Sequence, residues 1–329
     1  MEKQEKVYIG VDISKAKFDV YFKLGTGEET KAKLDNNLEG FSGLLNLLPA
    51  DSWVVMEASG PYYYQLASFL YDKGVLVSVI NPLVIKRFTQ MKLSRTKTDS
   101  ADAKSIAEYG SLLKIKPWEP LKSCYLEIKQ WYAYRKQLLK HQHAIQMKLE
   151  AFISTGTLND LLRESIENEL FKLDENIKEV DRRLNHLIDQ ENGKLREQLE
   201  SVPGIGPKTS LLLIVALRGF ENFQNYKQII SYLGLSPRIY ESGTSVKGKA
   251  KICKMGMSEV RKCLYMAARS AKSYNKACIE LYTRLRSKGK AHKVAMVAVI
   301  NKLIKQVFAI VKSDSYYTQN HSTTRVVAK

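Results

Sequence analysis

A seven-residue hydrophobic repeat in the middle of the chain constrains the fold more than any other feature of the sequence. From residue 122 to 154, large apolar side chains recur every seven residues, at Trp131, Leu138, Ile145 and Phe152, with Ile128 and Leu149 beside them. After a break at residues 154–157, a second run advances by alternating steps of four and three residues: Ile166, Leu170, Leu173, Ile177, Val180, Leu184 and Leu187. This spacing is typical of α-helices that pack along a coiled-coil seam, so two long helices are expected here.

The repeat leaves the partner of each helix open. Two helices joined by a short break would form a long antiparallel hairpin within the chain, but the same seam could pair between subunits. The helices could also belong to an ordinary helical bundle in the core of one domain. As a coiled coil, the segment would act as a spacer or a dimerisation arm.

Before the repeat, short β-branched and apolar runs alternate with helical patterns. Strands are predicted at residues 7–13, 18–23, 29–35, 53–57 and 75–80, and helices at 38–48 and 61–73, with Gly74 ending the second helix. Three strands in succession, followed by β-α-β connections, predict a mixed sheet with helices on both faces.

After the repeat, the pattern is mainly helical. An apolar helix is predicted at residues 211–217, a loop rich in Gly, Ser and Lys at 237–255, and helices near 257–273, 276–287 and 290–313. The fold class is therefore α/β plus α. We expect an α/β domain at residues 1–115, a coiled-coil segment at 116–196, a mainly helical domain at 197–315 and a flexible tail at 316–329.

The net positive charge of the chain is confined to residues 201–329, because the residues before them hold equal numbers of basic and acidic side chains. Residues 201–329 hold 23 Lys and Arg against 5 Asp and Glu, which accounts for the whole net charge of +18. Such a concentration of like charge repels itself unless a polyanion offsets it, and a nucleic acid backbone is the usual partner. The alternative is a solvated basic face that maintains solubility.

The remaining composition indicates a protein of the cytoplasm. We find no apolar run of the ~20 residues that a membrane helix needs and no apolar signal core behind the polar N-terminus. The four cysteines show no paired spacing and are expected to be reduced and mostly buried. His141 and His143 have no accompanying cysteine or zinc motif, so a zinc site is not expected.

Four carboxylates of the first domain are candidates for a metal site. Asp12 lies inside the first predicted strand and Glu57 at the end of the fourth, while Asp99 and Asp102 are three residues apart at the start of a helix. A spacing of three places both on one helical face, and adjacent parallel strands would bring Asp12 and Glu57 side by side. An all-oxygen set suits Mg²⁺ or Mn²⁺, and a pair of such ions can stabilise both oxygens of a phosphodiester displacement. Alternatively, Asp99 only caps its helix and Glu57 is a surface residue.

Two motifs of the last third could contact phosphate. In residues 202–209 (Val-Pro-Gly-Ile-Gly-Pro-Lys-Thr), Gly204 and Gly206 would let backbone N–H groups approach a phosphate, as in a helix-hairpin-helix unit, with Lys208 adding charge. An ordinary glycine turn is the alternative. The loop at residues 240–249 carries Ser242 and Ser245 among glycines and lysines. Either serine could be an activated nucleophile, or the loop could bind phosphate without catalysis.

Taken in order, these motifs resemble those of one family. The sequence is similar throughout its length to the insertion-sequence transposases with an N-terminal resolvase-like (RuvC-like) DEDD domain and a C-terminal serine domain, the bridge-RNA-guided recombinases. The matching motifs of the first half are residues 8–12 (Tyr-Ile-Gly-Val-Asp), 56–60 (Met-Glu-Ala-Ser-Gly) and 97–103 (Lys-Thr-Asp-Ser-Ala-Asp-Ala). Those of the second half are residues 202–206, 234–238 (Gly-Leu-Ser-Pro-Arg), 241–243 (Glu-Ser-Gly), 252–256 (Ile-Cys-Lys-Met-Gly) and 261–265 (Arg-Lys-Cys-Leu-Tyr).

The resemblance implies a function and its residues. Asp12, Glu57, Asp99 and Asp102 would be the metal-binding catalytic acids of a ribonuclease-H-like fold, and Ser242 the nucleophile that forms a covalent intermediate with the scissile phosphate. In this family, the serine of one subunit completes the acid site of another, so a homo-oligomer, dimer or tetramer, is expected. Members recognise their donor and target DNA through a noncoding RNA, with base pairing selecting the sequence and the protein contacting the backbone.

Basic and glycine residues near these motifs are predicted to bind nucleic acid. They are Arg95, Lys97, Gly204, Gly206, Lys208, Arg238, Lys247, Lys249, Lys251, Lys254 and Arg261. Two other functions remain possible from the residues alone. One is a structure-specific nuclease similar to the Holliday-junction resolvases, in which the same acids and a metal-activated water cut DNA without a protein adduct. The other is a non-enzymatic nucleic-acid-binding protein whose acids are structural.

Overall fold

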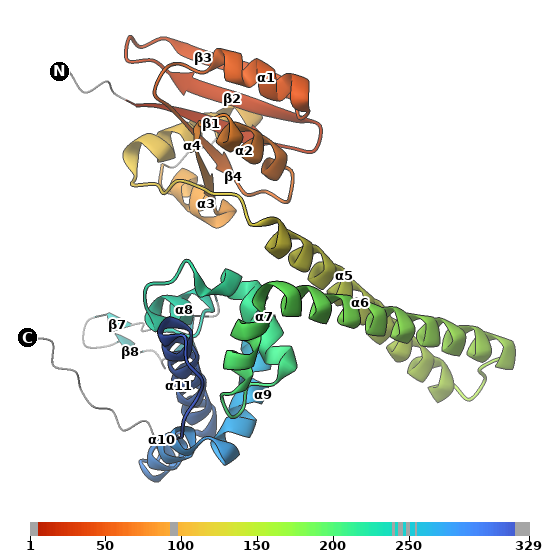
Figure 1. Ribbon diagram of the computed structural model, residues 1–329. Helices are drawn as coiled ribbons and strands as arrows, with labels where there is room; N and C mark the ends of the chain where they lie inside the picture. Colours follow the sequence, from red (N-terminus) through yellow and green to blue (C-terminus); the bar gives the residue numbers. More distant parts are fainter. Residues whose placement is uncertain are drawn as a thin grey trace, which may run out of the picture. The chain divides into compact units, whose positions relative to one another are not determined.

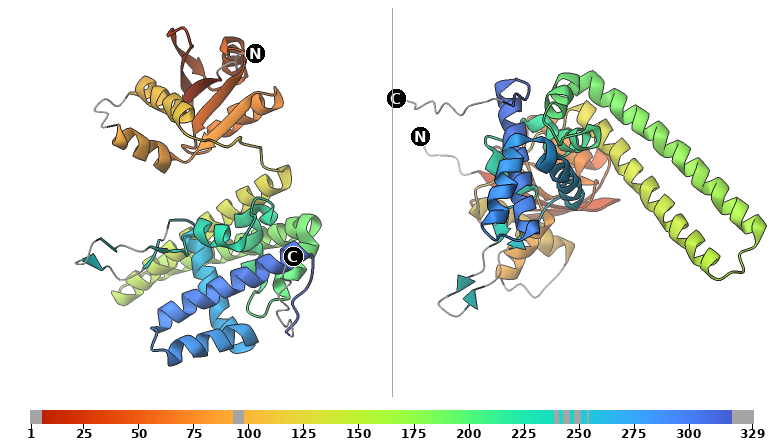
Figure 2. Two further views of the ribbon diagram at one scale, coloured as in Figure 1. Left: turned by 90° about the vertical axis from the view of Figure 1, so that its left-hand side faces the viewer. Right: turned by 90° about the horizontal axis from the view of Figure 1, so that it is seen from below.

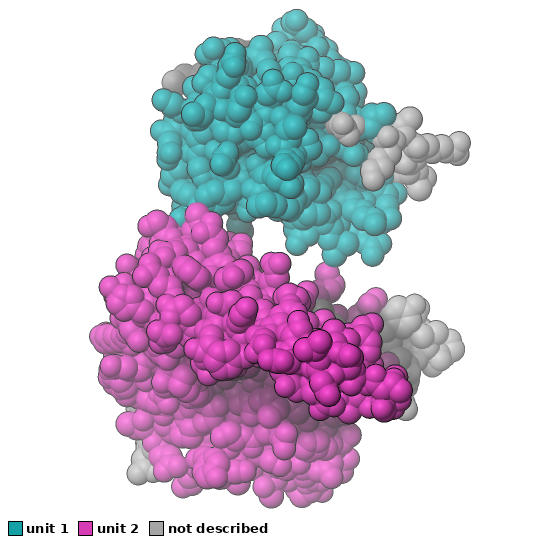
Figure 3. Space-filling view, turned by 90° about the vertical axis from the view of Figure 1, so that its right-hand side faces the viewer, with its two compact units in different colours: residues 1–121 teal, residues 122–329 magenta. Residues whose placement is uncertain are grey.

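The computed structural model describes residues 6–92, 98–238, 241–242, 246–247, 251–253 and 255–319. The chain forms two compact units, residues 1–121 and residues 122–329, which are shown in different colours in Figure 3. Each unit is described by itself below.

Unit 1 is built on a five-stranded mixed sheet, as the sequence predicts. Its strands are β1 (Val7–Ile13), β2 (Lys17–Lys23), β3 (Glu29–Asp35), β4 (Ser52–Glu57) and β5 (Leu76–Ile80), in the order β3-β2-β1-β4-β5. The β1–β2 and β2–β3 pairs are antiparallel, whereas β1–β4 and β4–β5 are parallel. The three-strand meander and the two crossovers therefore meet at β1, which lies at the centre of the sheet.

Helices cover the two faces of the sheet in pairs (Figure 1). On one face, α1 (Leu38–Leu47) and α2 (Tyr63–Asp72) pack on the alternate apolar residues of the strands, including Ile9, Val11 and Phe18. On the other face, α3 (Pro82–Met91) and α4 (Asp99–Leu112) pack around Val55. Asparagine side chains cap α1 and α3 by accepting backbone N–H bonds, and a proline opens α3, which explains why these boundaries are readable in the sequence.

The hydrophobic repeat forms a long antiparallel helical hairpin within the chain. Its helices, α5 (Ser123–Ser154) and α6 (Asp160–Glu200), lie side by side in the right-hand view of Figure 2. The seam is buried at the open end of the hairpin, where Ile128 and Leu184 have no exposed surface. Across it, Arg135 Nη2 donates to Asp181 Oδ2 at 3.0 Å. Of the pairings that the sequence left open, the structure therefore has the hairpin.

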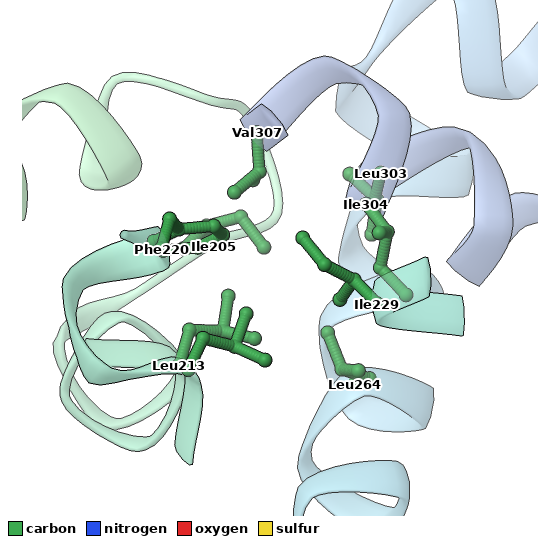
Figure 4. A pocket seen from close by; sticks show the side chains of 9 residues that line it. Ile205, Leu213, Phe220, Ile229, Leu264, Leu303, Ile304 and Val307 are labelled. Atoms are coloured by element: carbon green, nitrogen blue, oxygen red, sulfur yellow. The ribbon is translucent and has the colours of Figure 1, made fainter. Parts of the chain in front are cut away.

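The rest of unit 2 is a bundle of helices: α7 (Pro207–Leu217), the short 3-10 helix η1 (Arg218–Phe220), α8 (Tyr226–Tyr232), α9 (Ser258–Tyr274), α10 (Lys276–Ser287) and α11 (His292–Ser313). Figure 4 shows the apolar side chains at its centre pointing toward one another, among them Leu213, Ile229, Leu264 and Leu303. The space between them is too small for a water molecule, so this is core and not a ligand cavity.

Helix α11 lies where the sequence analysis predicts the last helix. By length and composition alone it could cross a membrane, although no such segment is expected from the sequence. In the structure many of its apolar residues, among them Met296, Val299, Ile300, Leu303 and Ile304, are buried, and the helix packs against α8, α9 and α10. Its apolar length is therefore that of a core helix in a bundle, because a helix surrounded by others is apolar on most sides.

The segment predicted as a loop between residues 237 and 255 contains extended pairs. Strand β6 (Pro237–Arg238) pairs antiparallel with β9 (Lys251–Ile252), and β7 (Glu241–Ser242) pairs antiparallel with β8 (Val246–Lys247). The prediction of a loop is thus wrong for these residues. The pairing was not predictable, because strands of only two residues are too short to show an alternating pattern and glycine and serine lie between them.

All four cysteines are free, as expected for reduced thiols. The expectation that they are mostly buried is wrong, because Cys278 is buried whereas Cys124, Cys253 and Cys263 are half-buried. Burial raises the pKa of the Cys278 thiol to about 11, so it stays protonated and unreactive at neutral pH.

Candidate functional site

Strands β1 and β4 bring two of the candidate acids together at one end of the sheet. Val11 is the parallel partner of Met56, and continuing this register by one residue places Asp12 beside Glu57. The neighbours Val11 and Met56 are buried on the α1–α2 face, so strand alternation puts Asp12 and Glu57 on the opposite face, beneath α4. Both acids are half-buried.

Helix α4 runs antiparallel to β1 in close contact with it. A Cβ atom on Gly10 would lie 1.9 Å from the carbonyl oxygen of Ala103, and one on Gly110 would lie 2.7 Å from Val55 Cγ2 and 3.1 Å from Tyr8 Cδ1. Gly110 near the end of α4 therefore lies over the start of β1, and Ala103 lies over Gly10. Asp12, further along β1, is consequently level with the first turn of α4.

The first turn of α4 carries the other two candidate acids. Thr98 caps the helix, because its hydroxyl accepts the Ala101 N–H at 3.2 Å. The suggestion that Asp99 is only the cap is therefore wrong. Asp102 is half-buried beside the buried Ala103, which packs on the sheet, whereas the side chain of Asp99 lies outside the described part of the structure.

Glu57 is held by a hydrogen bond within its own loop. The Ser59 hydroxyl donates to Glu57 Oε1 at 2.9 Å, immediately before Gly60 with its positive φ of 72°. A carboxylate that is half-buried and hydrogen-bonded is not the plain surface residue that the sequence left as an alternative. Ser59 and Gly10 were both missed as positioning residues. A glycine inside an apolar strand was the available signal for a close backbone approach.

The candidate ligands suit a hard divalent cation in their chemistry. Asp12, Glu57, Asp99 and Asp102 are all carboxylates, and β1, β4 and the first turn of α4 place them at one end of the sheet. Oxygen-only donor sets are typical of Mg²⁺ and Mn²⁺ sites. Within the described side chains, no three acids, histidines or cysteines are close enough as they stand to enclose a metal ion.

The two glycines of the turn between α6 and α7 have different surroundings. Gly204 has a φ of +107° and packs against α9, because a Cβ there would lie 2.7 Å from Ala271 Cβ and 2.9 Å from the Ala267 carbonyl oxygen. Its close approach is thus to a helix of the same unit, not to open space. Gly206 has no such neighbour within 4 Å and precedes α7, whose first turn carries the exposed Lys208. Only the Gly206 side of the turn is open to a phosphate.

Two glycines join the ends of the segment that carries Ser242. A Cβ on Gly234 would lie 2.5 Å from the Met255 carbonyl oxygen, and one on Gly256 would lie 2.5 Å from the Tyr232 carbonyl oxygen. Arg261 Nη1 also donates to the Leu233 carbonyl at 2.9 Å, which ties α9 to this crossing. The chain therefore leaves and re-enters the helical bundle at one point. Between these ends, Ser242 lies in β7 with its backbone opposite Val246.

The predicted nucleic-acid contacts fall into three groups. Lys208, Arg238 and Lys251 are exposed. Arg261 is half-buried and makes the structural hydrogen bond described above. The other basic residues lie outside the described part of the structure: Arg95, Lys97, Lys249 and Lys254 entirely, and Lys247 in its side chain. The same holds for the two candidate nucleophiles, Ser245 entirely and Ser242 in its side chain.

Comparisons with known proteins cover most of the chain. A model of the DEDD domain of IS110 transposases matches residues 9–155, and a model described as "Transposase IS116/IS110/IS902 family" matches residues 196–283. The first match contains all four candidate acids, and the second contains Gly204, Gly206 and Ser242.

Individual relatives agree with the family models. The pilin gene-inverting protein of Moraxella bovis is 29% identical over 322 residues, which cover 94% of this chain and 97% of that protein. The transposase for insertion sequence element IS1328 of Yersinia enterocolitica is 24% identical over 289 residues, which cover 79% of this chain and 82% of that protein. A DEDD domain on a ribonuclease-H-like sheet, followed by long helices and the second family domain, shows that the chain is an IS110-family transposase.

Proposed function

We propose that this transposase cuts and rejoins DNA through a covalent intermediate on Ser242, at a site completed by Asp12, Glu57, Asp99 and Asp102. The observation that carries the proposal is the convergence of Asp12, Glu57 and the first turn of α4 at one end of the sheet. A sheet gains no stability from acids gathered at one end, because like charges placed side by side repel each other. Such a group is retained when a cation and a phosphate occupy it.

Mg²⁺ or Mn²⁺ would be held by these four carboxylates. When bound, such an ion neutralises charge on the phosphate oxygens during displacement. The protein's own contribution is to fix the carboxylates: β1 and β4 set the spacing of Asp12 and Glu57, the Gly10 contact sets the height of α4, and Ser59 orients Glu57.

In the proposed step, the Ser242 oxygen attacks the scissile phosphorus and loses its proton to a base. A bond forms between the serine oxygen and phosphorus, and the bond from phosphorus to one sugar oxygen breaks. The departing sugar oxygen takes up a proton, so charge and atoms balance without an oxidant. Attack by the sugar hydroxyl of another strand reverses these bonds and rejoins the DNA.

The partners follow from the same proposal. The basic residues of the last third would contact the backbones of the element ends, the target DNA and a noncoding guide RNA. A homo-oligomer would let the serine of one subunit reach the acids of another, and the protein would work in the cytoplasm, on chromosomal DNA. One relative is named a pilin gene-inverting protein and another a transposase, and both names describe reactions that rearrange DNA.

A covalent-adduct trap tests the proposal. The full-length protein is incubated with Mg²⁺, the DNA of its own element and RNA from the flanking noncoding region, then denatured and probed for attached DNA. The lanes are wild type, Ser242→Ala, Ser245→Ala, Asp12→Asn and, as a charge-matched control on the same sheet, Asp35→Asn. We expect the adduct in wild type, Ser245→Ala and Asp35→Asn, and its loss in Ser242→Ala and Asp12→Asn.

Other outcomes contradict the proposal in different ways. DNA cut without an adduct, with Ser242→Ala still cutting, would identify a nuclease that uses activated water. An adduct that disappears in Ser245→Ala but persists in Ser242→Ala would assign the nucleophile to Ser245.

A further inference from the structure

A row of charged residues crosses four neighbouring strands at the acid site. Asp12 on β1 is the register partner of Asp19 on β2, and Asp19 is the register partner of Lys33 on β3. Glu57 on β4 lies on the other side of Asp12. Partners directly across a sheet point to the same face, so all four side chains share the α4 face in the order Lys33, Asp19, Asp12, Glu57.

Asp19 is a fifth carboxylate that neither the motif spacing nor the family pattern selects. Its side chain is 16% exposed, and it receives the Lys33 ammonium, with Nζ 3.3 Å from Oδ2. Its Cβ is about 5 Å from that of Asp12, as for any directly paired residues. Two carboxylates at this spacing destabilise a sheet unless cations lie close to them.

A second ion pair on the same strands gives a useful contrast. Lys17 and Asp35 are also register partners on β2 and β3, but their charged atoms are 3.8 Å apart and the side chains are 56% and 63% exposed. Solvent screens the charges of such an exposed pair, so the pair contributes little to the stability of the fold. In the Asp19–Lys33 pair the charged atoms are closer, and Lys33 is 53% exposed, much like Lys17. The difference lies in the Asp19 carboxylate, which is mostly shielded from water, so its field acts on Asp12 with less screening.

We propose that Asp19 and Lys33 set the affinity of the acid site for divalent cations: Asp19 adds negative potential beside Asp12, and Lys33 limits that potential while holding Asp19 in place. The inference rests on the metal site of the proposed function. In this arrangement Lys33 is the internal counter-cation of a site that carries an excess of acids. Its charge offsets repulsion both among the carboxylates and between the carboxylates and an incoming DNA phosphate.

Opposite effects of the two substitutions distinguish this role from a structural one. Asp19→Asn removes a negative charge next to Asp12 and weakens divalent-cation binding, whereas Lys33→Met removes a positive charge and strengthens it. Each change is expected to alter the affinity about threefold or more at physiological salt, because it removes one unit charge, partly screened, from the row that contains Asp12. A pair that only stabilised the sheet would shift binding in the same direction when either member was removed.

The measurement is Mn²⁺ binding to the full-length protein without nucleic acid, read from the paramagnetic resonance signal of free Mn²⁺. Asp35→Asn and Lys31→Met are matched controls, because they make the same charge changes on β3 at sites further from Asp12. The two control substitutions are expected to change the Mn²⁺ affinity by less than half as much as Asp19→Asn and Lys33→Met do. Thermal unfolding without metal verifies that each variant is folded.

The result that overturns the inference is wild-type Mn²⁺ affinity in folded Asp19→Asn and Lys33→Met, or a shift of both in one direction. Failure of the underlying metal site looks different: wild type and Asp12→Asn would then bind Mn²⁺ equally weakly. The two failures are therefore separable in one experiment.

Discussion

The arrangement of the four candidate acids depends on Gly10, because a glycine has no side chain and lets α4 lie close to β1. Its neighbour across the helix–sheet contact is the Ala103 carbonyl oxygen, 1.9 Å from where a Cβ would lie. Any side chain there has to push α4 away from β1, and α4 carries Asp99 and Asp102. The residue therefore couples the stability of unit 1 to the geometry of its acids.

Gly10→Ala is expected to lower the free energy of unfolding of unit 1 by about 2 kcal/mol or more, because overpacking forces the helix off the strand. The matched control is Gly25→Ala, since a Cβ at Gly25 would meet nothing within 4 Å. Denaturant unfolding of the two variants measures the difference. Equal stability of Gly10→Ala and Gly25→Ala would mean that α4 does not press on β1.

Cys278 provides a pH-dependent prediction at the same scale. Burial raises the pKa of its thiol to about 11, above its value in the unfolded chain. The unfolded chain therefore loses its thiol proton first as pH rises. The stability that this group contributes is complete below about pH 8.5 and is lost progressively up to about pH 11, by roughly 3 kcal/mol in total. Between pH 7.5 and 10, the free energy of unfolding of the wild type should fall more than that of Cys278→Ala. An equal fall in both proteins would contradict this prediction.

Among the elements, the α5–α6 hairpin contains both buried and exposed leucines on one helix. Leu184 has no exposed surface, whereas Leu161 is 77% exposed. Leu184→Ala is expected to cost about 2–4 kcal/mol of unfolding free energy, and Leu161→Ala less than about 0.5 kcal/mol. Thermal or denaturant unfolding monitored by helical circular dichroism compares them. A large effect of Leu161→Ala instead would mean that the far end of the hairpin is covered in solution.

The elements also show what a sequence can and cannot disclose. The strands of unit 1 and the hairpin helices were predictable because their apolar periods are long and their ends carry Asn, Pro and Gly with specific backbone roles. The acids Asp12 and Glu57 were predictable because a carboxylate among buried strand residues stands out.

The features that sequence analysis missed depend on contacts between distant residues. Gly204 looked like a phosphate contact because its pattern is local, but its partner is Ala271, which is remote in sequence. Asp19 was passed over because a single acid on an alternating strand is ordinary, and only the register of β1 and β2 places it opposite Asp12. The reason for the long apolar sequence of α11 is visible only in the structure, where the neighbouring helices pack against it.

For the whole molecule, the uneven charge predicts how binding depends on salt. Residues 201–329 carry the net charge of +18, and Lys208 is exposed in the first turn of α7 beside the open Gly206. If Lys208 contacts a phosphate, Lys208→Gln reduces the slope of log affinity against log salt by about 0.9 for duplex DNA. The affinity falls similarly for all DNA sequences, because a backbone contact does not distinguish bases.

Lys178→Gln serves as the control for this measurement. Lys178 is an exposed lysine of α6 whose ammonium already pairs with Asp174 at 2.9 Å and Glu175 at 3.0 Å. Its loss should leave the salt slope unchanged. The slopes are measured by fluorescence anisotropy with a labelled duplex. Identical slopes for wild type and Lys208→Gln would mean that the turn between α6 and α7 does not contact DNA.

The crossing of Gly234 and Gly256 has a consequence for how this protein can change in evolution. Since the two ends of the Ser242 segment are already fixed together, the entropy of closing the loop grows only with the logarithm of its length, and doubling the loop adds about 0.6 kcal/mol. Residues can therefore be inserted or deleted between the glycines while the helical bundle below keeps its packing. We therefore expect changes in the length of this segment to alter the surroundings of Ser242 while the helices that hold its two ends keep their packing.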